Sequence, residues 1–233
     1  MKPALIEAKG PVDAWLKAVR FLADNGDAFN VIISIEVPLD FEDSELASYD
    51  PRKKLKTARS VEDVANTIFP KKSPKWDLAD TDFANYYRQA YRSLLRRGPR
   101  SWGAYFLRLI NFGDSRVNQL EKIICGLGGW GRNHKATFVV HFSSSETDAP
   151  RPLGAPCLQF CEFLREGEKL SLLAVYRSHD YYLKALGNFV GLSRLLQYVS
   201  ERTDIPVGSI ICHSTYAYLA NNKARSVALI SEG

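Results

Sequence analysis

The feature that most constrains the fold is a hairpin pattern followed by one long helix. LQFCEFLRE at 158–166 and KLSLLAVYRS at 169–178 are rich in strand-forming residues, and the turn EGE joins them. GNFVGLSRLLQYVSERT at 187–203 then repeats apolar residues at helical spacing, and VGSIICHSTYAYL at 207–219 predicts a further strand. This order predicts an α+β protein whose mostly antiparallel sheet is covered by helices.

The first part of the chain has a less regular pattern. Residues 39–58 are polar and predict a loop, whereas the segments around them have recognisable periods and end signals. Helices are expected at 11–25, 60–69, 83–97 and 117–129, and strands at 31–38 and 136–143.

Composition indicates an ordinary globular protein. The 233 residues are 45% hydrophobic, which suffices for one core and predicts a single domain over 1–233. The net charge of +5 suits an anionic ligand such as a phosphate, but the basic residues are scattered, so we expect no nucleic-acid partner. The four cysteines and four histidines show no metal-ligand spacing. The sequence contains no run long enough to span a membrane, and a cytoplasmic location with free thiols is expected.

Five polar residues around the hairpin carry the candidate chemistry. Cys157 follows a loop at the start of the first strand, where a thiol can be exposed and, beside a cation, can act as a nucleophile. Arg177 and Ser178 end the paired strand and suit a phosphate, and Asp180 offers an acceptor. Asn188 has the donor and acceptor needed to recognise a nucleobase. Plainer interpretations are a core cysteine, a surface Arg–Asp pair and a helix N-cap at Asn188.

Taken together, these residues resemble the catalytic half of the thymidylate synthase family. Arg177, Asp180 and Asn188 follow Cys157 by 20, 23 and 31 residues, as in the family. Leu158 after the cysteine resembles the short archaeal-type and nucleotide hydroxymethylase branches. The resemblance covers 136–219, with a weaker match to the family's Gly-Tyr-Gly-Arg region in YFLRLINFGDSRVNQLEKIICGL. We therefore divide the single domain into a divergent part, 1–100, and a catalytic core, 101–233.

The resemblance implies a role for each residue. Cys157 would add to C6 of a pyrimidine nucleotide and make C5 nucleophilic. Arg177 and Ser178 would hold the 5′-phosphate, and Asp180 would orient the pterin of 5,10-methylenetetrahydrofolate. Asn188 would read O4 and N3 of the base, which favours uracil and makes 2′-deoxyuridine 5′-monophosphate (dUMP) the expected substrate.

The chain departs from the family pattern at four places. In one of them, the Gly-x-Pro-Phe segment before the family's Asn reads Lys184-Ala185-Leu186-Gly187, which changes the wall on the folate side. The arginine pair that reaches the partner subunit's phosphate is replaced by GRNHK, which leaves Arg132 or Lys135 for that role. The sugar-binding His is missing, and its position falls on Tyr218, or on Tyr216 if the alignment has a two-residue gap. The helix of the catalytic Glu is not assignable, and Glu62 is the only Glu in the candidate segment SVEDVANTIF.

Three functions remain open at this point. The first is folate-dependent transfer of a methyl or hydroxymethyl group to C5 of a pyrimidine nucleoside monophosphate by a homodimer. The second is a catalytically inactive nucleotide-binding protein or partner subunit. The third is an interaction protein that shares only the fold. The retained cysteine and phosphate-binding pair favour the first function, and the lost arginines and histidine favour the second.

Overall fold

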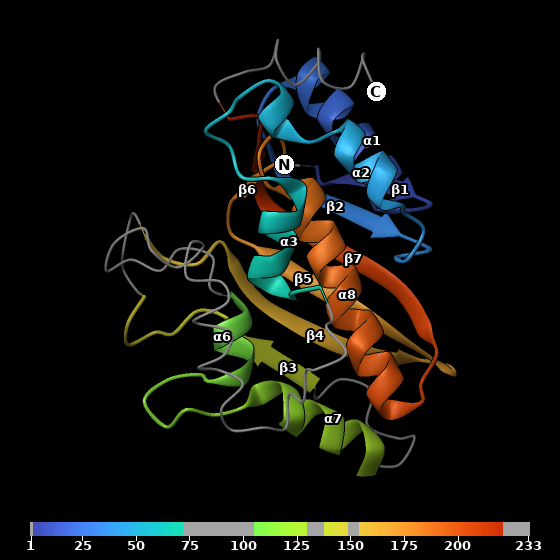
Figure 1. Ribbon diagram of the computed structural model, residues 1–233, viewed down its shortest axis with the longest axis vertical. Helices are drawn as coiled ribbons and strands as arrows, with labels where there is room; N and C mark the ends of the chain where they lie inside the picture. Colours follow the sequence, from blue (N-terminus) through green and yellow to red (C-terminus); the bar gives the residue numbers. More distant parts are fainter. Residues whose placement is uncertain (1, 72–104, 130–137, 149–153, 221–233) are drawn as a thin grey trace.

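A computed structural model describes residues 2–71, 105–129, 138–148 and 154–220 (Figure 1). Within these ranges the chain forms a mixed sheet and a set of helices. The strands are β1 (Ala4–Ala8), β2 (Ala28–Ile35), β3 (Phe138–His141), β4 (Leu158–Glu166), β5 (Lys169–Tyr176), β6 (His179–Asp180) and β7 (Val207–Tyr218). The helices are α1 (Pro11–Asn25), α2 (Asp43–Ser48), α3 (Val61–Ile68), α6 (Tyr105–Ile110), α7 (Gln119–Gly129) and α8 (Ala185–Thr203), with a short 3₁₀ helix at Pro51–Lys53.

The strands form one sheet with the order β1-β2-β7-β5-β4-β3, and β6 pairs with β7 beyond the end of β5. Neighbours β2–β7, β4–β5 and β3–β4 are antiparallel, whereas β1–β2, β5–β7 and β6–β7 are parallel. The predicted α+β class and thymidylate synthase-like architecture are confirmed. The sheet is mixed because β5 reaches β7 through the long helix α8, a crossover that makes the two strands parallel.

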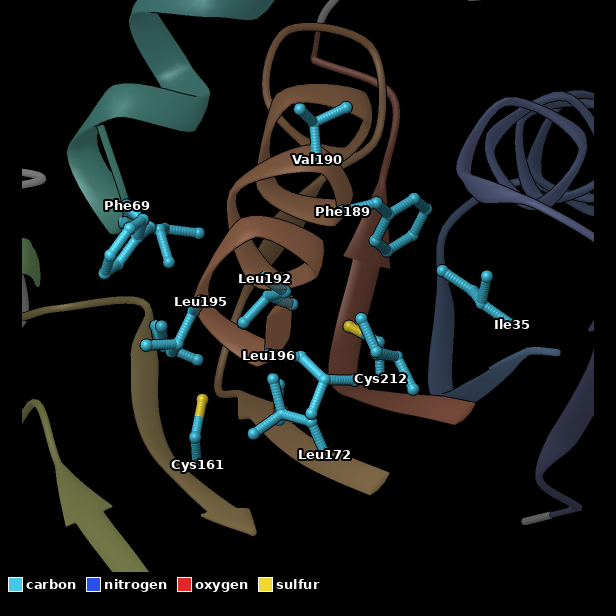
Figure 2. Packing of buried hydrophobic residues seen from close by; sticks show 14 of the residues in the cluster. Ile35, Phe69, Cys161, Leu172, Phe189, Val190, Leu192, Leu195, Leu196 and Cys212 are labelled. Atoms are coloured by element: carbon cyan, nitrogen blue, oxygen red, sulfur yellow. The ribbon is translucent and has the colours of Figure 1, made fainter. Parts of the chain in front are cut away.

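The predicted hairpin forms β4 and β5. Gly167 lies in its turn with a φ of 60°, a left-handed conformation that glycine adopts without steric cost. The central strands alternate between a buried face and a partly exposed face, and the buried residues point toward α8. Figure 2 shows this packing, in which apolar residues of the helix meet residues from the strands. The labelled residues are Phe189, Val190, Leu192, Leu195 and Leu196 of α8, with Ile35, Phe69, Cys161, Leu172 and Cys212 around them.

Helix α3 packs closely against α8, and two glycines allow this approach (Figure 1). A Cβ added to Gly187 would lie 2.6 Å from both the carbonyl oxygen of Val61 and the Cβ of Val64. A Cβ added to Gly191 would lie 2.8 Å from the carbonyl oxygen of Ala65. Helix α3 begins with the predicted capping box, so both its packing and its start follow from local sequence.

The structure also contains elements that the sequence did not predict. Strand β1 precedes α1, β6 follows β5, and α2 and the 3₁₀ helix occupy the expected loop at 39–58. The helix expected at 83–97 lies outside the described residues. Among the described helices, none has both the length and the apolar character required to cross a membrane.

Candidate active site

The site lies where pairing along β7 changes from β5 to β6. Tyr176 is the last residue of β5 and pairs with Ser214, and the next pairing along β7 is that of His179 in β6. Arg177 and Ser178 lie between these two ladders. The Thr215 hydroxyl donates to the carbonyl oxygen of Arg177 at 2.8 Å, which holds this short connection against β7. Both residues thus leave the regular ladder at a position that the sheet fixes.

Cys157 lies beside this break because β4 pairs with β5. The backbone N–H of Arg177 donates to the carbonyl oxygen of Cys157 at 2.9 Å. The thiol is free and partly exposed. Burial raises the pKa of Cys157, the charges of Arg177 and Lys184 oppose that rise, and the charge of Asp180 adds to it. A nucleophilic thiolate is therefore disfavoured by burial and favoured by two cations.

The Arg177 guanidinium is held by the loop that precedes Cys157. Its Nε donates to the carbonyl oxygen of Pro156 and its Nη2 to that of Ala155, each at 3.0 Å. A guanidinium has five N–H donors, so three remain for an anion. The interpretation of Arg177 and Asp180 as a surface ion pair is wrong, because backbone groups hold the arginine and the carboxylate is buried.

Asp180 is 9% exposed and accepts several backbone hydrogen bonds. Its Oδ1 accepts from the N–H groups of Tyr182 and Leu183 at 3.0 Å each, and the carboxylate also accepts from the N–H of Ala220. Burial raises the pKa of Asp180, while these hydrogen bonds and the charge of Lys184 oppose the rise. The carboxylate therefore shapes the turn that leads from β6 into α8.

Ser178 and Tyr218 are in direct contact. Tyr218 ends β7 opposite Asp180, and the Ser178 hydroxyl hydrogen-bonds the Tyr218 hydroxyl. Burial raises the pKa of Tyr218 to about 12, with smaller contributions from the charges of Asp180 and Cys157. The Tyr216 ring stacks on Tyr218, but its hydroxyl donates to Asp27, the residue just before β2, at 2.5 Å. The structure thus brings Tyr218 into the cluster and leaves the Tyr216 hydroxyl outside it.

Asn188 lies within the first turns of α8, whose N-cap residue is Lys184. The interpretation of Asn188 as the helix N-cap is therefore wrong. The side chain is 5% exposed, and its Nδ2 lies 3.0 Å from Nε2 of His179. His179 is itself buried. A histidine within Arg-Ser-His-Asp, two residues past Arg177, was the only available signal of this contact.

Tyr105 of α6 is a site residue that the sequence analysis did not identify. Its buried hydroxyl accepts from the backbone N–H of Leu158 at 3.4 Å and from that of Cys157. Burial raises the pKa of Tyr105, so the hydroxyl stays protonated and is available as a donor near the thiol. Tyr105 opens the stretch YFLRLINFG, and the weak resemblance of that stretch was its only signal.

Glu62 does not join this cluster, and two further candidates fall in a part of the chain that the structure does not describe. Glu62 of α3 forms a two-point ion pair with Arg194 of α8, with an Oε2–Nη2 distance of 2.7 Å and an Oε1–Nη1 distance of 3.0 Å. This pair occupies both of its carboxylate oxygens. Arg132 and Lys135 lie outside the described residues.

Comparisons with known proteins agree with this architecture. No protein-family model matches the chain. Curated archaeal proteins named "Putative thymidylate synthase" are similar to it: one from Methanococcoides burtonii is 22% identical over 98% of the chain and 95% of that protein. Another from Methanocaldococcus jannaschii is 24% identical over 80% of the chain and 83% of that protein, and one from Methanothermobacter marburgensis is 32% identical over 44% and 45%. In sequence along almost its whole length, the chain is thus similar to archaeal proteins with this name, and its α+β fold is consistent with a divergent thymidylate synthase-like family.

Proposed function

We propose that this protein transfers a one-carbon unit to C5 of a pyrimidine nucleoside monophosphate, with dUMP as the substrate. The observation that supports the proposal is the convergence of Cys157, Arg177 and Ser178 at the break between β5 and β6, with the buried Asp180 in β6 close enough for its charge to act on Cys157. A nucleophile next to an anion-binding pair suits a substrate that has both an electrophilic ring carbon and a phosphate.

The chain's own residues supply the first step. The Cys157 thiolate forms a bond to C6 of the pyrimidine, and the π electrons of the C5–C6 bond move to C5 and O4. The carbanion at C5 would then form the new carbon–carbon bond as the bond between the one-carbon unit and the nitrogen of its donor breaks. Water would complete a hydroxymethyl product, and a hydride from the reduced folate donor would complete a methyl product. Loss of the C5 proton and departure of the thiolate restore the double bond and the free cysteine. The charges of Arg177 and Lys184 favour the thiolate. The Tyr105 hydroxyl contacts the backbone of Cys157, so it lies near the thiolate and can stabilise its negative charge.

A bound 5,10-methylenetetrahydrofolate would supply the carbon at the oxidation level of formaldehyde. Asp180 is the residue in the described site that fits a pterin ring. A carboxylate offers about four acceptor positions, and backbone N–H groups take three at Asp180, so one remains for an N–H donor of the ring. Lys184 to Gly187, which follow this carboxylate, replace the Gly-x-Pro-Phe wall of the family.

Binding of the nucleotide and reaction at C5 can be tested separately. Calorimetry should show dUMP binding, and Arg177→Ala should weaken it by about 2 to 4 kcal/mol because the phosphate loses a charge-assisted partner. Tritium release from C5-labelled dUMP with the folate donor should require Cys157 and disappear in Cys157→Ala, which should still bind nucleotide. No dUMP binding by the intact protein would contradict the proposal.

Nucleotide binding without catalysis is the second candidate function. The raised pKa of Cys157 and the replacement of the sugar-binding His by Tyr218 favour it. It predicts dUMP binding that protects Cys157 from alkylation, with no tritium release under any folate condition. Both functions therefore predict dUMP binding, and only the catalytic function predicts tritium release.

We further propose that the protein acts as a homodimer in which sheets pack face to face. The helices cover one face of the sheet, and the opposite face carries partly exposed apolar side chains on neighbouring central strands. Such a face suits burial against a second copy. Arg132 and Lys135 are the candidates to reach the partner's phosphate. The apolar residues of this face are Ile32, Phe160, Leu164, Leu173, Val175 and Ile211.

A further inference from the structure

A buried chain of hydrogen bonds connects Asn188 to the centre of the sheet. Nδ2 of Asn188 lies 3.0 Å from Nε2 of His179, and Nδ1 of His179 lies 2.9 Å from the Ser214 hydroxyl. The Tyr181 hydroxyl lies 3.0 Å from the same Ser214 oxygen. His179 is 1% exposed and Ser214 is fully buried. The one-carbon chemistry above uses neither His179 nor Ser214.

Aromatic neighbours fix the His179 ring. It stacks on Tyr176 with a centroid distance of 4.1 Å and an interplanar angle of 7°, and the Phe189 ring lies nearly perpendicular to it with a centroid distance of 6.0 Å. Burial lowers the pKa of His179 to about 3. The ring is therefore neutral at neutral pH, and one of its nitrogens donates while the other accepts.

The hydrogen-bond partners decide which nitrogen carries the proton. The amide nitrogen of Asn188 can only donate, so Nε2 of His179 accepts and the ring proton lies on Nδ1. Nδ1 then donates to the Ser214 oxygen. The Ser214 hydroxyl is then free to donate its own proton either to Cys212, with which it is also hydrogen-bonded, or to the Tyr181 hydroxyl. Every link of the chain is satisfied in this arrangement.

The same arrangement leaves one hydrogen-bond acceptor and one donor of the Asn188 amide available to a ligand. Among the described residues, none hydrogen-bonds its Oδ1, and its second amide hydrogen is not used by His179. An acceptor beside a donor matches N3–H and O4 of uracil. To match cytosine the amide must turn over, which places Oδ1 against the lone pair of Nε2. This repulsion is relieved only if the proton of the His179 ring moves from Nδ1 to Nε2. The Ser214 hydroxyl must then donate to Nδ1 instead of accepting from it.

We propose that His179, supported by Ser214, is a positioning residue that holds Asn188 in the orientation that selects uracil over cytosine. The inference rests on the proposed function, because it concerns the base of the nucleotide that Cys157 attacks. Selectivity arises from the repulsion that the buried ring imposes on the turned-over amide, in addition to attraction to the correct base.

Two substitutions of His179 separate this role from simple packing. The Asn side chain in His179→Asn can replace Nδ1 and keep the bond to Ser214, but it does not reach Asn188. The longer side chain in His179→Gln can replace Nε2 and reach Asn188. Ser193→Ala is the matched control, because Ser193 is a buried residue of α8 whose hydroxyl donates to the carbonyl oxygen of Phe189 at 2.9 Å, away from Asn188.

The experiment measures binding of uridine and cytidine monophosphates, in both sugar series, by calorimetry. The wild-type protein and Ser193→Ala should prefer uridine nucleotides by about tenfold or more. His179→Asn should bind both bases within about twofold of each other. His179→Gln can contact Asn188 but loses the bond to Ser214, so it should regain only part of the uridine preference. If His179→Asn does not fold, Ser214→Ala takes its place and should also narrow the preference.

Each other outcome has a distinct meaning. Wild-type binding with an unchanged uridine preference in His179→Asn would overturn this inference and leave the proposed function standing. The absence of any nucleotide binding by the wild-type protein would overturn both. Nitrogen NMR of the free wild-type protein gives a second readout that needs no nucleotide. It should show His179 as a single neutral tautomer protonated at Nδ1, and protonation at Nε2 would contradict the orientation assigned to Asn188.

Discussion

At the scale of single residues, burial suppresses charge on both kinds of titratable group at the site. It raises the pKa of the Cys157 thiol and lowers the pKa of the His179 imidazole, because a low-dielectric environment disfavours the charged form of an acid and of a base alike. The free protein therefore has a protonated thiol and a neutral ring at neutral pH. The thiolate that the proposed catalysis requires is favoured by the charges of Arg177 and Lys184.

The reactivity of Cys157 should reveal this balance. Its alkylation rate by iodoacetamide should rise with pH around a midpoint above that of an unburied cysteine. Of the two cations that lower the pKa of Cys157, Arg177 has the larger effect. Arg177→Met should therefore move the midpoint to a higher pH, and Arg177→Lys, which keeps the positive charge, should move it less. Mass spectrometry of the modified peptide gives the rate, with exposed Cys125 as an internal reference. A midpoint unchanged in Arg177→Met would contradict an electrostatic role for the guanidinium.

The neutral state of His179 should affect stability in acid. Its folded pKa of about 3 lies below the ordinary value of 6.5, so between these pH values the unfolded chain binds a proton that the folded protein does not. This group makes the protein lose about 1.4 kcal/mol of stability per pH unit as the pH falls through that window. Urea unfolding from pH 6 to pH 4 should therefore show a shallower loss in His179→Gln. Equal slopes would indicate a ring that is protonated in the folded state.

Residue spacing predicted much of the site but not its internal contacts. Cys157, Arg177 and Ser178 are placed by hairpin pairing, which is a local consequence of sequence. The bond between His179 and Asn188 spans the end of a sheet and the start of a helix, and Tyr105 approaches Cys157 from a helix 52 residues earlier. Such contacts depend on how the elements pack, and no periodicity in one sequence encodes them.

At the scale of elements, close packing of α3 on α8 depends on two helical glycines. Gly187→Ala should destabilise the protein by about 1 to 3 kcal/mol, because the new Cβ meets the backbone of Val61 and the Cβ of Val64. Gly128→Ala in α7 is the control: nothing lies within 4 Å of its added Cβ, so a gain of about 0.5 to 1 kcal/mol is expected. Thermal unfolding measures both, and equal effects would contradict a packing role for Gly187.

The elements that were predicted correctly have strong local signals. Helix α1 matches its predicted range, and α3 begins at the expected capping box. Strands β1 and β6 lacked such signals: β1 has five residues, β6 has two, and both exist only because a neighbouring strand pairs with them. Short edge and connecting strands are stabilised by tertiary pairing more than by their own propensity.

At the scale of the whole molecule, the proposed dimer depends on the sheet face that carries partly exposed apolar side chains and lies opposite the described helices. Leu173 and Ile211 lie opposite each other on β5 and β7, near the middle of that face. Leu173→Glu should convert a dimer to a monomer at micromolar concentration, because it places a charge in an apolar interface. Leu39→Glu is the control, since this exposed apolar residue lies outside the strands. Light scattering that shows a monomeric wild-type protein would contradict the homodimer.

The position of β7 has a consequence for synthesis on the ribosome. This strand is the last of the described chain to be made, yet it lies at the centre of the sheet, between β2 and β5. In the described sheet, β7 joins the pair β1–β2 to the group β3–β4–β5, so each of these two groups would have an unpaired edge until β7 is made. Pairing across such long sequence separations is slow, and open edges invite aggregation. A nascent chain that stalls before Val207 would therefore expose two unpaired strand edges that are prone to aggregate. The twelve residues of β7 close both edges and join the two groups of strands into one sheet.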